Sequence, residues 1–111
     1  MVITYQIATY NILIVSDYAQ GGGYQTGYVH LYGKKSKYLG YLGIIKDGNV
    51  LPQNTQHSNG ILNIYLHEPG LQTILNTLRN QSPISIQFDT SLKWGALVIG
   101  NQSASKNELA A

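Results

Sequence analysis

The chain has 111 residues, of which 43% are hydrophobic and 11% are charged, and it carries a formal net charge of +2 and no cysteine. This length suits one compact domain with a hydrophobic core, and the lack of cysteine excludes disulfides and thiolate chemistry. The net charge is too small to indicate nucleic-acid binding by itself. A surface so poor in charge is typical of proteins that self-associate or bind a partner.

The first segment, from Thr4 to Tyr18, is rich in β-branched and aromatic residues and contains no glycine or proline. It predicts one long strand, apolar on both faces, which is typical of a central strand or of an interface. At this length we expect the strand to be bent or to carry a bulge. Tyr10, Ile12 and Ile14 lie on one face, and Ile7, Leu13 and Val15 on the other. The N-terminal residues lack the basic start of a secretory signal, and the longest apolar run is too short to span a membrane. We therefore expect a cytoplasmic protein without membrane contact.

The middle of the chain predicts two further strands, at residues 24–32 and 37–46. Three glycines at 21–23 predict a flexible connection before the first of them, and residues 33–36 are typical of a hairpin turn. Gly40 and Gly43 interrupt the second strand. Glycine inside a strand often marks a bulge or the close approach of another backbone.

The hydrophobic period changes between residues 61 and 88 and then changes back. Residues 61–67 alternate as in a half-buried strand, and after a break the apolar residues recur at i, i+3, i+4 and i+7, which indicates an amphipathic helix of about eleven residues. Residues 82–88 resume the period of two, and residues 92–99 predict a last strand. We expect one core cluster from the switching segment: Leu62, Ile64, Leu71, Ile74, Leu75, Leu78, Ile84, Ile86 and Phe88.

These elements predict a single α+β domain over residues 1–102 and a polar, poorly ordered C-terminal tail over 103–111. About six strands in the order β-β-β-β-α-β-β, joined by short turns, favour a mainly antiparallel sheet. One short helix cannot cover a sheet of six strands. We therefore expect the sheet to be strongly curved, or its uncovered face to meet a second copy of the protein.

Catalytic and metal chemistry have no recognisable motif in this sequence. No nucleophile elbow or serine-histidine-acid pattern occurs, so we predict no catalytic residue, no cofactor and no enzymatic activity. Glu68 adjoins His67 at the helix start, where a carboxylate is more typical of capping than of catalysis. His30, His57 and His67 lack the spacing of metal ligands, so no metal site is predicted.

The remaining signal is aromatic, because the chain contains nine tyrosines. Strand alternation places Tyr28, His30 and Tyr32 on one face of the second strand. If the apolar residues between them point at the helix, the opposite face of the sheet can bind a ligand through aromatic and polar groups. This predicted surface consists of Tyr28, His30, Tyr32, Lys34, Lys35, Asn63, Tyr65 and His67. The other interpretation is that tyrosine is simply a good strand former.

Four segments resemble an uncharacterised family of short bacterial domains: residues 41–48, 51–54, 60–66 and 78–83. That family carries a leucine-arginine-asparagine motif between its helix and its next strand, found here as Leu78-Arg79-Asn80. Gln81-Ser82 replaces the expected acid and lysine, and the resemblance implies no activity for these residues. The order of four strands and a helix also resembles Pur-type single-stranded nucleic-acid-binding modules, by topology alone.

The preferred functional prediction is a non-enzymatic binding or interaction module that works as a homo-oligomer. The alternative is a protein that binds single-stranded nucleic acid or a nucleotide through the tyrosine-rich face, and a third interpretation is a carbohydrate-binding module. We expect a dimer or higher oligomer because residues 7–15 and 92–99 are apolar on both strand faces. Its interface is expected to bury Trp94 or its strand neighbours, together with part of the tyrosine-rich face.

Overall fold

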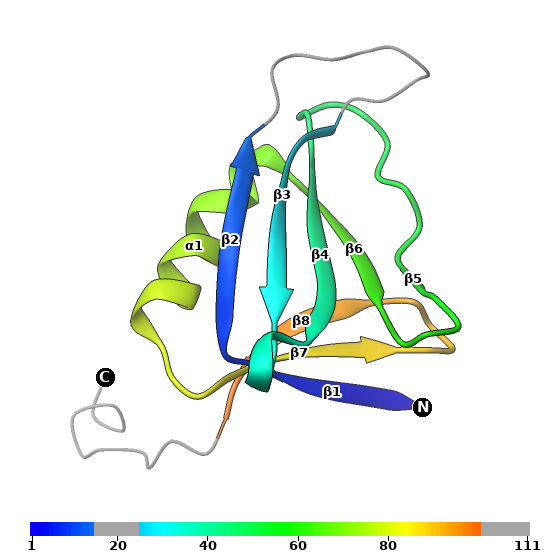
Figure 1. Cartoon of the computed structure of the whole chain (residues 1–111). Coiled ribbons are helices and arrows are strands. Elements are labelled where there is room, and N and C mark those ends of the chain that lie inside the picture. Colours follow the sequence, from blue (N-terminus) through cyan, green and yellow to red (C-terminus); the bar gives the residue numbers. More distant parts are fainter. Residues whose placement is uncertain (15–24, 101–111) are drawn as a thin grey trace, which may run out of the picture.

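The computed structural model describes residues 1–14 and 25–100. These residues form two β-sheets and one helix (Figure 1). The predicted glycine connection at 21–23 and the predicted tail at 103–111 lie outside the described residues.

The larger sheet has five strands in the order β2-β3-β4-β6-β5. Its members are β2 (Thr9–Ile14), β3 (Gln25–Tyr32), β4 (Tyr38–Ile45), β6 (Leu62–His67) and β5 (Thr55–Gln56). All its neighbours pair antiparallel except β4 and β6, which are parallel. A short 3-10 turn, η2 (Lys34–Ser36), connects β3 to β4.

The smaller sheet has three antiparallel strands in the order β1-β7-β8. They are β1 (Val2–Ile7), β7 (Ile84–Asp89) and β8 (Gly95–Ile99). In Figure 1 these strands run across the lower end of the larger sheet. The 3-10 turn η3 (Glu68–Gly70) leads directly into the helix α1 (Leu71–Asn80).

The helix confirms the predicted change of period. Leu75 and Leu78 are buried, and Leu71 and Ile74 are partly buried against the same core. Together with the preceding 3-10 turn the helical segment has 13 residues. In the described part of the chain, no helix has both the length and the apolar character needed to cross a membrane.

The prediction of one strand from Thr4 to Tyr18 is wrong. The described part of this segment breaks at Ala8 into β1 and β2, which belong to different sheets and leave the break in different directions (Figure 1). Ile7 is buried at the end of β1, and the Ala8 backbone amide donates to the Tyr32 carbonyl at 2.8 Å. Because of this break, β1 joins the smaller sheet, which covers the core, and β2 adds an edge strand to the larger sheet.

The structure also corrects the prediction of one strongly curved sheet of about six strands. The described residues form eight strands in two sheets, mostly antiparallel, and neither sheet is strongly curled. Instead of curling, the larger sheet has one face covered by α1 and by the three-stranded sheet. We call this covered side the inner face, and the opposite side the outer face.

The core lies between the inner face, the helix and the smaller sheet. Seven of the nine side chains of the predicted cluster are buried in it, and the other two, Leu71 and Ile74, pack against it. Phe88 and Val29 have no exposed surface. The two sheets are in close contact at Gly95 of β8. A Cβ atom at this position would lie 2.5 Å from Cδ1 of Ile64 on β6, so only glycine fits between the sheets here without a shift.

Leu75→Ala tests whether the apolar side of α1 stabilises this core. Because Leu75 is 8% exposed and packs in the core cluster, the truncation should lower the free energy of unfolding by about 2–5 kcal/mol. Urea denaturation followed by circular dichroism measures the loss. Val50 is 92% exposed, so Val50→Ala serves as the control and should stay within about 0.5 kcal/mol of the parent. Equal effects of the two changes would contradict the packing of the helix.

Candidate functional site

Six aromatic rings gather on the outer face of the five-stranded sheet. Three come from β3, two from β4 and one from β6, and all six residues are partly exposed. We call this cluster the tyrosine face: Tyr28, His30, Tyr32, Tyr38, Tyr41 and Tyr65. The apolar residues that alternate with them, such as Val29 and Leu31, are buried on the inner face. The sequence-based assignment of the two faces is thus confirmed.

The rings form one connected set. Tyr28 stacks on His30 with ring centroids 5.6 Å apart, and Tyr41 meets Tyr28 edge-on at 5.1 Å. Tyr41 also contacts Tyr65 at 6.0 Å, which carries the cluster across the parallel pair of strands. At the other end, Tyr38 lies 5.6 Å from His30 and 5.4 Å from Tyr32. Contacts of this geometry contribute roughly 0.5–1.5 kcal/mol per pair beyond area burial and hold the rings in place.

Two short hydrogen bonds fix the polar tips of the cluster. The hydroxyl oxygens of Tyr41 and Tyr65 are 2.9 Å apart, and His30 Nδ1 lies 2.8 Å from the Tyr38 hydroxyl. Burial, followed by the hydrogen bond with Tyr65, raises the pKa of Tyr41 well above its ordinary value. Burial also raises the pKa of Tyr38, helped by the neighbouring phenols of Tyr32 and Tyr28. Both phenols therefore stay protonated in alkali that ionises an ordinary tyrosine.

Tyr38 and Tyr41 were not among the predicted site residues. They stand three positions apart, so an uninterrupted strand would send them to opposite faces. The pairing of β3 with β4 shifts register between Leu31 and Tyr32, next to Gly40. Gly40 has a φ of +145° and lies so close to β6 that a Cβ would be 2.1 Å from the Leu62 carbonyl oxygen. This irregularity brings both tyrosines to the outer face, and Gly40 was its sequence signal.

Gly43 leaves space for the Tyr65 ring. It is opposite Tyr28 on β3 and opposite Tyr65 on β6. A Cβ at Gly43 would lie 2.6 Å from the Tyr65 ring and 2.8 Å from the Gln25 side-chain nitrogen. The missing side chain therefore lets the Tyr65 ring lie down over β4, towards Tyr41.

Three lysines lie at one end of the cluster. Lys34 and Lys35 belong to η2, the turn between Tyr32 and Tyr38, and Lys37 follows it. All three are exposed. Lys35 has a φ of 57°, which turns the chain sharply there. Lys34 and Lys35, which were predicted for the site, are thus next to two of its tyrosines along the chain.

Asn63 and His67, also predicted for the site, are on β6 but make their contacts elsewhere. The Asn63 side-chain nitrogen lies 2.7 Å from Nε2 of His57, and Nε2 of His67 lies 2.6 Å from the Asn49 carbonyl oxygen. Both partners belong to the segment between β4 and β6. Neither residue has a ring contact with the aromatic cluster. Their hydrogen bonds instead attach the segment between β4 and β6 to β6, at the border of the tyrosine face.

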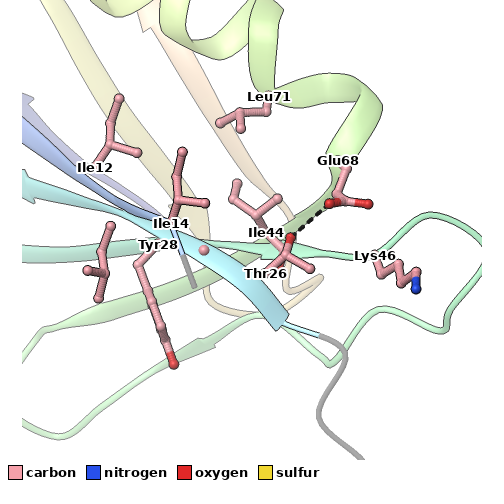
Figure 2. Close-up of a pocket in the computed structure, with 10 residues that line it drawn as sticks. Ile12, Ile14, Thr26, Tyr28, Ile44, Lys46, Glu68 and Leu71 are labelled. Carbon is pink, nitrogen blue, oxygen red and sulfur yellow. Dashed lines mark hydrogen bonds between the residues drawn. The ribbon is translucent and has the colours of Figure 1, made fainter. Parts of the chain in front are cut away.

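The prediction that Glu68 caps the helix is wrong. No side chain caps either η3 or α1. The Glu68 carboxylate instead accepts a hydrogen bond from the Thr26 hydroxyl at 3.1 Å, drawn as a dashed line in Figure 2, and a longer one from the Asp47 backbone amide at 3.4 Å. It joins the start of β3 to the end of β4 and the start of the helical segment.

Across residues 1–14 and 25–100, no three histidine, cysteine, aspartate or glutamate side chains come together in a way that could hold a metal ion. Comparison with known proteins adds no assignment: no family model, no curated protein and no solved structure matches the chain. The tyrosine face therefore has to be interpreted from its own geometry.

The raised pKa values predict how stability responds to alkali. An unfolded tyrosine ionises near pH 10, whereas folded Tyr38 and Tyr41 remain protonated above that pH. Their contribution to the free energy of unfolding is fully present below about pH 10 and is lost as the pH rises towards their folded pKa values. We expect stability to fall above about pH 10, and to fall less steeply in Tyr38→Phe/Tyr41→Phe. Urea denaturation at a series of alkaline pH values measures both slopes, and identical slopes would contradict the assignment.

Proposed function

We propose that this protein is a non-enzymatic binding module whose tyrosine face binds single-stranded nucleic acid. The observation that carries the proposal is the connected set of six partly exposed rings on the uncovered side of the larger sheet. These rings are not needed to fill the core, which lies on the other side of the sheet. Their partial exposure leaves apolar surface in water that a flat ligand would cover.

Base stacking is the chemistry that such a surface favours. Each base of a single strand offers a flat π surface, and stacking on an aromatic side chain contributes about 1–3 kcal/mol per base, whatever the sequence. The rings of Tyr28, Tyr32 and Tyr65 come from both ends of the cluster and from two strands, so several bases can be held side by side. The neutral hydroxyl groups of Tyr38 and Tyr41 supply hydrogen bonds to base edges or sugars.

The distribution of charge supports an anionic ligand. Lys34, Lys35 and Lys37 stand at the end of the cluster, where they can contact phosphates of a strand that lies across the rings. The carboxylates in the described part of the chain make their hydrogen bonds away from the rings, and that of Asp47 accepts one from the Gly48 backbone amide. Glu68 accepts hydrogen bonds from Thr26 and Asp47, and Asp89 accepts them from the backbone amides of the β7–β8 turn. A phosphate chain on the tyrosine face therefore meets cations and no opposing acid from these groups.

A carbohydrate ligand is the second candidate, favoured by the hydroxyl groups among the rings. The hydroxyls of Tyr41 and Tyr65 lie 2.9 Å apart, and Asn11 of β2 extends the polar border by donating to the Tyr32 hydroxyl at 3.5 Å. Sugars bind by stacking on rings and by hydrogen bonds to such groups, without phosphate contacts. The two candidates differ in salt dependence, because only phosphate contacts release counterions.

Fluorescence anisotropy with a labelled oligothymidine tests the proposal. Tyr32→Ala should weaken binding by about 1–3 kcal/mol through the lost stacking partner. Lys34→Ala/Lys35→Ala should weaken binding and reduce the slope of log affinity against log salt by roughly 0.7 for each lost phosphate contact.

Two control variants match these changes. Trp94 is exposed outside the tyrosine face, so Trp94→Ala removes an aromatic ring and should leave affinity unchanged. Lys46→Ala/Arg79→Ala removes the same two charges from elsewhere on the surface. Binding of a neutral oligosaccharide with no salt dependence, and no binding of oligothymidine, would favour the carbohydrate instead. Equal losses in test and control variants would contradict the tyrosine face as the ligand surface.

A further inference from the structure

The strand β2 is an open edge of the larger sheet. It pairs with β3 on one side, and no residue in the described part of the chain pairs with its other side. Three consecutive apolar residues on it are exposed: Ile12 at 37%, Leu13 at 52% and Ile14 at 77%. An edge strand presents unpaired backbone donors and acceptors that readily pair with another strand.

The usual protection of such an edge is missing from β2. Proteins block edge pairing with charged side chains, proline, bulges or very short strands. The sequence Thr9-Tyr10-Asn11-Ile12-Leu13-Ile14 has no charge and no proline, and its register with β3 is unbroken over six residues. The edge strand β1 also lacks charge and proline, but its exposed side chains are the polar Thr4 and Gln6 and the apolar Val2, whereas β2 exposes three consecutive apolar residues.

We propose that β2 pairs antiparallel with β2 of a second copy of this chain, about a twofold axis perpendicular to the sheet at Ile12. In that register Ile12 meets the partner's Ile12, Ile14 meets the partner's Tyr10, and Leu13 meets the partner's Asn11. The inner-face positions of β2 are Tyr10, Ile12 and Ile14, which are opposite the inner-face residues of β3 and Gly27. Apolar side chains therefore face apolar side chains across the axis on that side of the sheet.

A groove beside this edge supports the same pairing. It has a volume of about 410 Å³ and lies between the end of β2 and the start of the helical segment (Figure 2). Ile12, Ile14, Ile44 and Leu71 supply apolar walls, and the groove is open next to the exposed Ile14. The proposed register brings the partner's Tyr10 beside Ile14, at this open side, where an aromatic side chain would shield the apolar walls.

Charge favours a second copy over a different partner. The strand itself carries no charge, so two copies meet without repulsion. Beside it, Lys46 and Glu68 line the groove with one charge of each sign, which gives no preference for a strongly acidic or basic peptide. An isologous contact needs only this one self-complementary patch. The inference goes beyond the proposed function, because its interface is a strand edge and not the aromatic cluster.

Sedimentation velocity over a micromolar concentration series tests the pairing. The parent chain should sediment as a dimer, and Leu13→Lys/Ile14→Lys should sediment at half that mass, because each copy would then bring lysines into the paired edge. Val50→Lys places the same charge on a residue that is 92% exposed outside β2, and it should remain a dimer. A parent chain that is monomeric throughout, or a Val50→Lys chain that dissociates as readily, would overturn the proposal.

A crosslink tests the register even if the lysine variant fails to fold. The chain has no cysteine, so Ile12→Cys introduces a single thiol on the proposed twofold axis and should form an intermolecular disulfide under mild oxidation. Thr4→Cys, exposed on β1, should not. A dimer without the Ile12→Cys crosslink would overturn this interface and indicate another one. Tyr32→Ala should remain dimeric whether or not it binds oligothymidine, which separates this inference from the proposed function.

Discussion

The structure depends on covering one face of the five-stranded sheet with two elements. The ten-residue helix is about 15 Å long, whereas five strands spaced about 4.8 Å apart already span about 19 Å across the sheet. The helix therefore covers only part of the inner face, and the three-stranded sheet covers the rest. Gly95 makes this possible, because its missing side chain lets β8 approach Ile64 closely. The kink at Ala8 supplies the smaller sheet with its first strand.

Because α1 and the smaller sheet both lie on the inner face of the larger sheet, the side chains of the outer face are not needed to fill the core. These side chains interact mainly with one another, through ring contacts and hydrogen bonds between neighbouring strands. The buried residues of the same strands, such as Val29 and Leu42, hold the backbone in place beneath them. The cluster is thus rigid at its base and exposed at its tips, which is the arrangement that lowers the entropic cost of binding a ligand.

The helix and the core were predictable because the apolar period changes from two to 3.6 and back between residues 61 and 88. The break at Ala8 shifts the phase of the alternation, because the core-facing side chains are Ile3, Tyr5 and Ile7 in β1 but Tyr10, Ile12 and Ile14 in β2. The shift was not recognised in the sequence because Leu13, on the opposite face of β2, is apolar as well. The site was predicted in part. Strand alternation identified the side chains of β3, but Tyr38 and Tyr41 share a face only because of an irregularity at Gly40, whose size no local pattern specifies.

The pairing of β1 with β7 has a consequence for how the chain folds. Val2 is opposite Asp89, and the Thr90 hydroxyl donates to the carbonyl of Met1, 89 residues away. During synthesis β1 emerges well before its partner β7. The strands of the antiparallel β2-β3-β4 unit are close together in sequence. This unit can therefore form before β1 pairs with β7. Such non-local pairing slows folding, so we expect the smaller sheet, which covers part of the core, to close after the β2-β3-β4 unit has formed.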